Sequence, residues 1–214
     1  MERWEYELRA DIFDAFASNN RKMASELIED LISKKSGGLF YRYRPLSMLE
    51  LTSLRYDQIY FCRAIRFFNH TPDEDWIRFK SYVACFTDRK NSLSMWHDFA
   101  QGASGICTEY SYGDIQKFAE ENGLYFSPIC YRDGPLSLTG KVASVMSMVT
   151  KPKIRSGEYE WLLWKVDMHS SDIGKIMSGV RPRKVYIGRN ADLDSFLVQE
   201  LREIGVEKEI EIIG

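Results

Sequence analysis

The glycine pair at residues 37–38 divides the chain into a helical part and a part in which short strands and helices alternate. Residues 4–35 contain no proline or glycine, and apolar residues such as Leu8 and Ile12 recur there at helical spacing. The polar run at residues 18–20 interrupts this spacing and offers helix caps, so it predicts two helices rather than one. The chain therefore begins with a helical segment that the glycine pair ends.

Beyond the glycine pair, aromatic and β-branched runs bounded by Gly, Pro or polar turns predict strands. The expected strands are 39–44, 58–63, 82–87, 105–110, 124–131, 158–166, 184–188 and 207–213. The expected helices are 47–55, 92–101, 112–121, 141–149 and 191–204. This alternation predicts an α+β fold with a mostly antiparallel or mixed sheet. We expect an N-terminal helical segment over residues 1–37 and an α+β core domain over residues 38–214.

An apolar stripe on the first helix needs burial. Trp4, Leu8 and Ile12 recur on one side of this helix. The stripe could form a dimerisation or partner-docking element, or it could pack on the rest of the same chain, which is the commoner outcome. The sequence leaves the oligomeric state open.

The charges of the chain are nearly balanced, with 29 Lys+Arg against 31 Asp+Glu and a formal net charge of -2. Domains that bind nucleic acid through overall charge are usually strongly basic, so this balance argues against that class while allowing a local basic patch. No stretch approaches the ~20 apolar residues that cross a bilayer. The N-terminus mixes acidic and basic residues and has no apolar run of a secretory signal. We expect a cytoplasmic protein with no membrane association.

Metal sites and common catalytic motifs are not apparent in the sequence. The cysteines stand alone, with no C-x-x-C pair, which predicts reduced core thiols and no zinc: Cys62, Cys85, Cys107 and Cys130. The histidines lie far apart in the chain: His70, His97 and His169. There is no phosphate-binding loop, dinucleotide-binding turn, nucleophile elbow or two-histidine zinc helix. Any chemistry must come from a distributed set of residues, and no metal is expected.

Two arginines form the first part of that set. On the predicted strand 39–44, a period of two places Tyr41 and Tyr43 on one face and Arg42 and Arg44 on the other. Two permanent cations with planar forks on one face suit a phosphate or a carboxylate. The alternative is a solvated or salt-bridged strand face.

Two acidic residues form the second part of this set of candidate residues. Glu158 and Glu160 are two apart on a presumed strand and therefore share a face. Carboxylates this close repel each other, so the pKa of one should rise. Such a pair can hold a ribose hydroxyl or stabilise a developing cation; the alternative is two acids that face solvent on an edge strand.

A polar loop completes the set. It runs from Thr87 to Asn91 at the end of a buried-looking strand and leads into Trp96 and His97. Trp96 beside His97 could stack on a planar ring. The alternative is that Trp96 packs in the core and His97 faces water. A second loop, Asn69-His70-Thr71-Pro72, is interpreted as a turn.

The order of several segments points to a family. They are Leu39-Phe40-Tyr41-Arg42-Tyr43-Arg44, Ile59-Tyr60-Phe61, Arg66-Phe67-Phe68-Asn69 with Pro72, Cys85-Phe86-Thr87 with Asn91, Met95 and Trp96, then Ala100, Gly105 and Cys107, and Val185-Tyr186-Ile187-Gly188. Over roughly residues 39 to 188 this order resembles the bacterial domain-of-unknown-function family twenty-nine seventy-one. The chain departs from the family pattern at Leu162, where an arginine usually follows the Glu-x-Glu, and at His70-Thr71, where the family has an Asn-Asp-Pro turn.

The layout is also similar to that of ADP-ribosyltransferases, which share an early Arg, a mid-chain Ser or Thr and a late Glu-x-Glu. The similarity implies that Arg42 or Arg44 binds the phosphate or ribose of NAD and that Thr87 orders the site. It implies that Glu160 holds the nicotinamide ribose and stabilises an oxocarbenium-like transition state, while Glu158 helps to deprotonate the acceptor. The full expected set is Glu158 and Glu160 as catalytic residues and Arg42, Tyr43, Arg44, Thr87, Asn91, Trp96 and His97 as the NAD-binding residues, with Tyr43 or Trp96 stacked on nicotinamide.

Two classes of function follow from these features. The first is an NAD-consuming ADP-ribosyltransferase or glycohydrolase, a bacterial toxin or anti-phage effector with a protein or nucleic acid as acceptor. The alternative is a non-catalytic module of a bacterial defence or regulatory system that binds a nucleotide or a protein. A hydrolase or nuclease that uses the acids with His97 has no metal-ligand cluster to support it.

Overall fold

The computed structural model describes residues 1–64, 77, 79–134, 138 and 140–214. The predicted Asn69–Pro72 turn and the Arg66–Asn69 family segment lie outside the described residues. None of the described helices combines the length and the apolar character that crossing a membrane requires.

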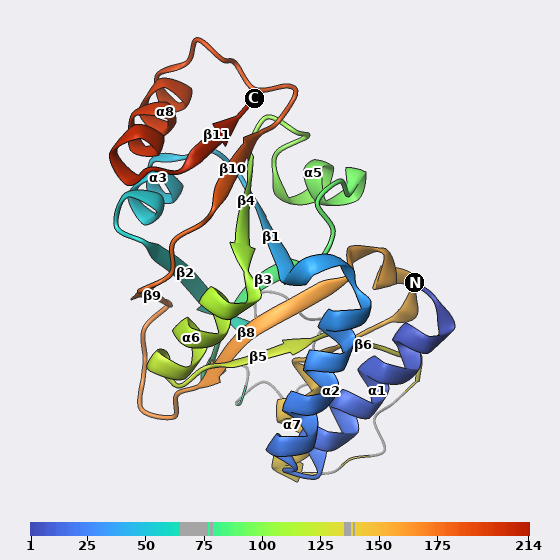
Figure 1. Ribbon diagram of the computed structural model, residues 1–214. Coiled ribbons are helices and arrows are strands. Elements are labelled where there is room, and N and C mark those ends of the chain that lie inside the picture. The colour runs from blue at the N-terminus through green and yellow to red at the C-terminus, as the bar shows by residue number, and fades with distance from the viewer. Residues whose placement is uncertain (65–76, 78, 135–137, 139) are drawn as a thin grey trace.

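The helices and strands follow the order expected from the sequence (Figure 1). The helices are α1 (Arg3–Ala17), α2 (Arg21–Lys34), α3 (Met48–Arg55), α5 (Leu93–Phe99), α6 (Tyr112–Asn122), α7 (Gly140–Ser147) and α8 (Phe196–Lys208). The strands are β1 (Leu39–Arg44), β2 (Gln58–Arg63), β3 (Ser81–Thr87), β4 (Ile106–Ser111), β5 (Tyr125–Pro128), β6 (Cys130–Tyr131), β7 (Thr150–Lys151), β8 (Glu160–Val166), β9 (Gly174–Ser178), β10 (Lys184–Ile187) and β11 (Glu211–Ile213). Strands β7 and β9 have no counterpart among the predicted strands.

Local side-chain caps define where several helices begin. The Asn20 side chain accepts a hydrogen bond from the amide of Met23 (3.2 Å), which starts α2 after the polar break. The hydroxyl of Ser111 plays the same part for α6. Gly123 follows α6 with a φ of 61°, a left-handed conformation that a glycine adopts without steric cost. The capping residues therefore set the helix boundaries from the sequence itself.

Nine of the described strands form one large, mostly antiparallel sheet in the order β11-β10-β4-β1-β3-β2-β9, in which β8 also pairs with β3 and β5 pairs with β8. Strand β3 pairs with β8 along its whole length, with β2 through Tyr82 and Val83, and with β1 through Thr87. Strands β10 and β11 are parallel, as are β6 and β7 in a separate pair. The α+β fold with a mixed, mostly antiparallel sheet and N-terminal helices is confirmed.

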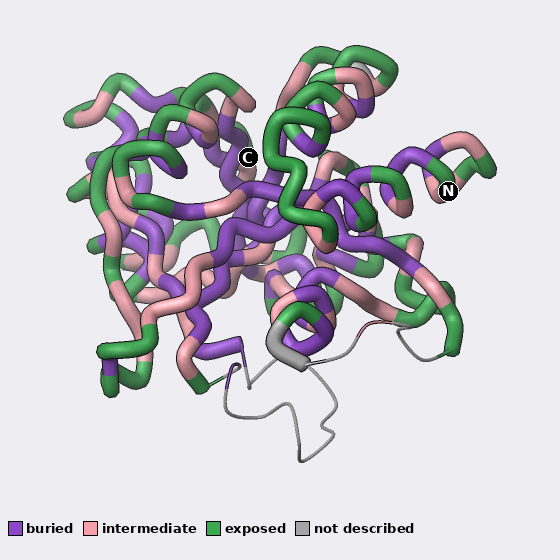
Figure 2. The backbone as a smooth tube through the Cα atoms, turned by 90° about the horizontal axis from the view of Figure 1, so that it is seen from below, coloured by how far each residue is buried: buried purple, intermediate pink, exposed green. Residues whose placement is uncertain are grey.

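The two faces of the sheet have different surroundings. On one face of β1, Phe40 packs with Phe86 and Trp161 in the main core. On the other face, Tyr41 and Tyr43 form a smaller cluster with residues of α5 and β4. Figure 2 shows the buried backbone concentrated in the middle of the molecule and the exposed residues on the outer loops and helix turns.

The apolar stripe of α1 is buried within this chain. Helix α1 packs against α2 and against strands β5 and β6 (Figure 1). Leu8 and Ile12 are 7% and 1% exposed and belong to the same core cluster as Phe40 and Trp161, with Trp4 partly buried at its edge. Packing on the rest of the same chain is thus the alternative that the structure shows.

The four cysteines, all of them among the described residues, form no disulfide bond, and Cys107 and Cys130 are buried. Burial raises the pKa of Cys107 to about 12 and that of Cys130 to about 11. Because the thiolate is the reactive form, we expect an alkylating reagent at pH 8 to leave both unmodified in the folded protein and to label both after denaturation. Mass spectrometry of labelled peptides measures this. Stoichiometric labelling of Cys107 under native conditions would contradict the packing of β4.

Candidate functional site

The two arginines of β1 are occupied by one acidic residue. The Nη1 atom of Arg42 lies 2.9 Å from Oε1 of Glu50, and its Nη2 atom donates a 3.2 Å hydrogen bond to the carbonyl oxygen of Tyr60. The Nε atom of Arg44 lies 3.2 Å from Oε2 of Glu50. The Arg42 side chain is only 5% exposed and that of Arg44 is 35% exposed. Of the two alternatives, the structure shows the salt-bridged strand face.

Helix α3 brings Glu50 to the arginines. The Ser47 hydroxyl caps α3 by accepting a 3.3 Å hydrogen bond from the amide of Glu50. The Glu50 carboxylate pairs with the two arginines of β1 and has no described hydrogen bond to the Ser47 amide. Helix α3 packs against β2 and α8, and in this position both arginines are partners of one buried acid.

The arginines and the predicted catalytic acids lie on opposite sides of the sheet. Thr87 is directly opposite Tyr41 on β1 and directly opposite Glu160 on β8, and opposed residues in antiparallel strands share a face. Thr87 and Glu160 thus lie on the Tyr41 side, whereas Arg42 points to the other side. The structure therefore does not bring the arginines together with Glu160 as the predicted NAD site requires, because side chains alternate along β1.

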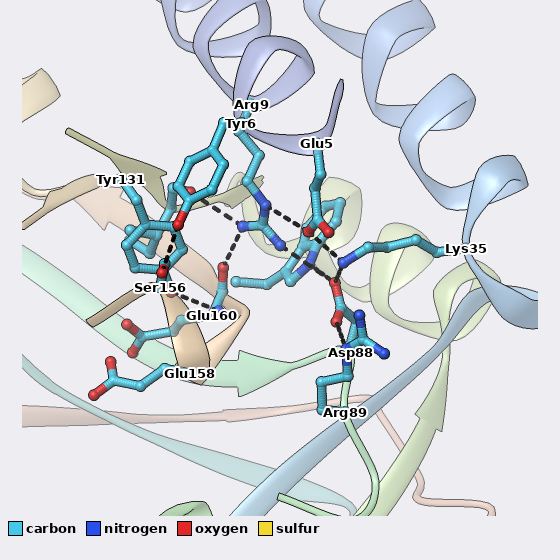
Figure 3. Close-up of polar contacts among 12 residues, drawn as sticks. Glu5, Tyr6, Arg9, Lys35, Asp88, Arg89, Tyr131, Ser156, Glu158 and Glu160 are labelled. Atoms are coloured by element: carbon cyan, nitrogen blue, oxygen red, sulfur yellow. Dashed lines mark hydrogen bonds and ion pairs between the residues drawn. The ribbon is translucent and has the colours of Figure 1, made fainter. Parts of the chain in front are cut away.

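Glu158 and Glu160 do not share a strand face. Strand β8 begins at Glu160, Tyr159 is in a left-handed conformation with a φ of 47°, and Glu158 ends a short 3-10 turn. The two carboxylates converge on Lys151 instead, whose Nζ atom lies 3.1 Å from Glu158 Oε2 and 2.5 Å from Glu160 Oε2. Arg155 also pairs with Glu158. In Figure 3 both carboxylates point away from Asp88.

The ionisation of this cluster reflects its burial. Burial raises the pKa of Glu158, and Glu160 adds to the rise while Lys151 opposes it. One pKa of the pair is raised, but the main cause is desolvation and not the mutual repulsion on which the prediction was based. Burial opposes the charged form of Lys151, but the two carboxylates outweigh it and raise the pKa of the lysine. Within this cluster the acidic and basic side chains pair with one another.

Thr87 orders the turn before β8. Its hydroxyl donates a 2.7 Å hydrogen bond to the carbonyl oxygen of Glu158 and accepts a 3.2 Å bond from the amide of Arg89. Thr87 is fully buried. It therefore connects the end of β3 to the turn that carries Glu158.

A cavity of about 690 Å³ lies beside α5 and contains three of the predicted site residues. Asn91, Trp96 and His97 line it. The other lining side chains are those of Lys90, Leu93, Ser94, Ala103, Tyr186, Ile187, Arg189 and Ile213. Tyr43 supports its wall from beneath: the Tyr43 hydroxyl donates to the carbonyl oxygens of Arg89 and Lys90, and its ring meets Trp96 edge-on with centroids 5.0 Å apart.

The charge of this cavity is one-sided. Lys90 and Arg189 are basic, the half-exposed Trp96 and Tyr186 supply aromatic surface, and no acidic side chain occurs among the described residues that line it. The ammonium of Lys90 lies 4.1 Å from the centre of the Tyr186 ring. The His97 side chain is 82% exposed and lies 2.9 Å from Asp98. In a chain with a net negative charge, the cavity is a local basic patch with aromatic walls.

A second cavity of about 490 Å³ adjoins the first and shares Lys90 and Asn91 with it. Its lining is more polar and includes Tyr41, Arg89 and Tyr159. The Arg89 guanidinium lies 4.1 Å from the centre of the Tyr159 ring. The loop over residues 88–92 therefore separates two hollows and presents a cation to each.

Tyr186 and Arg189 were not among the predicted site residues. Antiparallel pairing of β10 with β4 places Tyr186 opposite Cys107, which is itself opposite Tyr43 on β1. The Tyr186 hydroxyl donates a 2.8 Å hydrogen bond to Glu109, and burial together with this bond raises the pKa of Tyr186. The strand 184–188 was predicted, but its neighbour in the sheet could not be read from the sequence.

The described residues hold no group of three or more His, Cys, Asp or Glu side chains that could bind a metal ion. Comparison of the chain with known protein families, curated proteins and solved structures gave no match. The resemblance to the bacterial family of unknown function therefore stays a prediction, and the site must be interpreted from its own geometry.

Proposed function

We propose that this protein binds a nucleotide in the cavity lined by Trp96 and Tyr186. One observation carries the proposal: a cavity of about 690 Å³ combines aromatic walls with the cations Lys90 and Arg189 and has no acidic side chain among its described lining residues. Small-molecule sites are typically about 300–1,000 Å³ with mostly apolar walls and a few polar groups. A planar base with phosphates has the complementary chemistry.

The two parts of a nucleotide match two parts of the cavity. Trp96, Tyr186 and Leu93 offer surface on which a base can stack. Lys90 and Arg189 can pair with phosphate oxygens through charge-assisted hydrogen bonds. Lys90 now rests on the Tyr186 ring, so an anion would compete with the ring for its ammonium. Lys90 is exposed and its long side chain can reach either cavity.

The geometry favours binding over cleavage of NAD. Glycosidic cleavage needs a carboxylate beside the developing positive charge. Neither Glu158 nor Glu160 is among the described residues that line the two cavities, and both are paired with Lys151. These features support a non-catalytic nucleotide-binding module rather than an NAD-consuming enzyme.

Calorimetric titration with ATP at fixed ionic strength tests the proposal. Replacing Lys90 or Arg189 with methionine is expected to weaken ATP binding by about tenfold each, the loss of one charge-assisted contact. Lys117→Met is the matched control, because Lys117 is 77% exposed on α6 and is not among the cavity-lining residues. The proposal fails if the wild-type protein does not bind ATP, or if Lys90→Met binds it as tightly as Lys117→Met does.

NAD serves as a second ligand and separates the two classes of function. A nucleotide-binding module leaves NAD intact. If free nicotinamide accumulates, and Glu160→Gln abolishes this at an unchanged thermal midpoint, an NAD-consuming enzyme replaces the proposal made here.

A further inference from the structure

Arg9 of helix α1 is fully buried beside the loop that separates the two cavities. Its Nη1 atom donates to the carbonyl oxygens of Ile129 (3.1 Å) and Glu160 (3.0 Å), and its Nε atom donates to Glu5 (3.1 Å). Its Nη2 atom donates to Oδ2 of Asp88 at 3.3 Å. The side chain has 0% exposure. An arginine from the N-terminal helix therefore reaches the first residue of the 88–92 loop.

Two more donors meet the same oxygen of Asp88 (Figure 3). The Lys35 ammonium lies 2.8 Å from Oδ2, and the indole Nε1 of Trp161 donates to it at 3.0 Å. Lys35 also pairs with Glu5. One carboxylate oxygen thus accepts from α1, from the residue that follows α2, and from β8. The N-terminal segment supplies two of these three donors.

The network continues from Asp88 to the polar cavity. The Nε atom of Arg89 lies 3.6 Å from Oδ1 of Asp88. The ring of Tyr159 is contacted by two cations, the Arg89 guanidinium at 4.1 Å and the Lys35 ammonium at 4.7 Å. Asp88, Arg89 and Tyr159 all line the cavity of about 490 Å³. Buried charges of the N-terminal segment therefore lie behind the lining of this second cavity and contact its residues Asp88 and Tyr159.

We infer that Arg9 and Lys35, together with their shared partner Glu5, are positioning residues: they fix Asp88 and so hold the 88–92 loop with Lys90 where it meets the phosphates of the ligand. This inference rests on the proposed function. A loop that is already held in place avoids the entropy cost of ordering its cations when the anion binds. The role predicts a specific signature, because loss of positioning should weaken binding of the charged part of the ligand and spare the base.

Two tryptophans of β8 provide a matched pair of variants. Trp161→Phe removes the 3.0 Å indole bond to Asp88, and Trp164→Phe removes a 3.0 Å indole bond to Ser127. The two tryptophans are 1% and 5% exposed, so the loss of stability should be similar. We expect only Trp161→Phe to weaken ATP binding, by about threefold, while both variants bind adenosine as the wild-type protein does.

Two adjacent lysines provide the second pair. Lys35→Met removes an ammonium from Asp88, whereas Lys34→Met removes one that pairs at the surface with Asp30. We expect Lys35→Met to weaken ATP binding by about tenfold with adenosine binding unchanged, and Lys34→Met to change neither. Lys35→Arg keeps the positive charge and should restore most of the ATP affinity.

The inference is overturned if Lys35→Met binds ATP like the wild-type protein, or if its affinities for ATP and adenosine fall together. If the wild-type protein binds neither ligand, the proposed function fails, and amide hydrogen exchange then decides the positioning role separately. Faster exchange over residues 88–92 in Lys35→Met than in Lys34→Met supports it. Equal exchange over residues 88–92 in these two variants overturns it. If Lys35→Met does not fold, the same exchange comparison is made between Trp161→Phe and Trp164→Phe.

Discussion

Replacing Arg9 with methionine is expected to lower the free energy of unfolding by about 3–5 kcal/mol, the usual cost of removing one partner from a buried ion pair. The guanidinium is fully buried and satisfies two carboxylates and two backbone carbonyl oxygens. Methionine keeps much of the volume but leaves the carbonyl oxygens of Ile129 and Glu160 without this donor. Denaturant unfolding followed by circular dichroism measures the loss.

Arg3→Met is the control for this experiment. Arg3 pairs with Glu7 at the same four-residue spacing that separates Arg9 from Glu5, but its side chain is 92% exposed. Because exposed pairs contribute little to stability, we expect no measurable change in this variant. If Arg9→Met were as stable as Arg3→Met, the buried network at Asp88 would not be a stabilising feature of the fold.

Replacing Glu50 with alanine is the second large effect, again about 3–5 kcal/mol of lost stability, because it leaves the buried guanidinium of Arg42 without a counter-charge. Glu50 and Arg42 are 4% and 5% exposed in their side chains. Thermal and denaturant unfolding measure the change. Arg44→Met should cost far less, since Arg44 is 35% exposed and shares the same carboxylate.

A double variant distinguishes the loss of the Arg42–Glu50 ion pair from the cost of leaving one buried charge unpaired. Replacing Arg42 with methionine and Glu50 with leucine together removes both buried charges, so the double variant should be more stable than Glu50→Ala alone. It should also bind ATP with wild-type affinity, because Arg42 lies on the far side of the sheet from the proposed cavity. If this double variant had wild-type stability but did not bind ATP, Arg42 would instead be a phosphate-binding residue.

The arginines of β1 show what strand periodicity does and does not determine. The period of two correctly separated Tyr41 and Tyr43 from Arg42 and Arg44. It could not tell which face would be covered, because that depends on the packing of α3 against β2 and α8, which brings Glu50 to the two arginines. The same limit applies to Glu158: Tyr159 is left-handed and β8 begins at Glu160, two residues after Glu158, so the two acids do not share a strand face.

Helical spacing has a similar limit at Arg9. The pairs Arg3–Glu7 and Glu5–Arg9 have the same four-residue separation, and both would be taken for surface pairs. The second pair is buried because α1 packs against α2, β5 and β6 in the tertiary structure. The polar loop after β3 was recognised from its residues, but the partners of its Asp88, namely Arg9, Lys35 and Trp161, lie more than fifty residues away in the chain.

The candidate cavity was found in part because some of its residues are neighbours in sequence. Asn91, Trp96 and His97 follow one another after a buried strand, so a local pattern indicated them. Tyr186 and Arg189 come from the other end of the chain and meet them through the β10–β4 pairing. Pairing between distant strands is a tertiary property, and a single sequence contains little information on it.

The shared core of α1, α2 and the sheet has a consequence for how these elements can change in evolution. Leu8 and Ile12 of α1 pack in the same core as Trp161 of β8. Any homologue without a comparable helix pair must shield that tryptophan with another element and compensate the aspartate at the end of β3 with other cations. The two helices and the loop they brace should therefore have changed together in evolution, gained or lost as a unit.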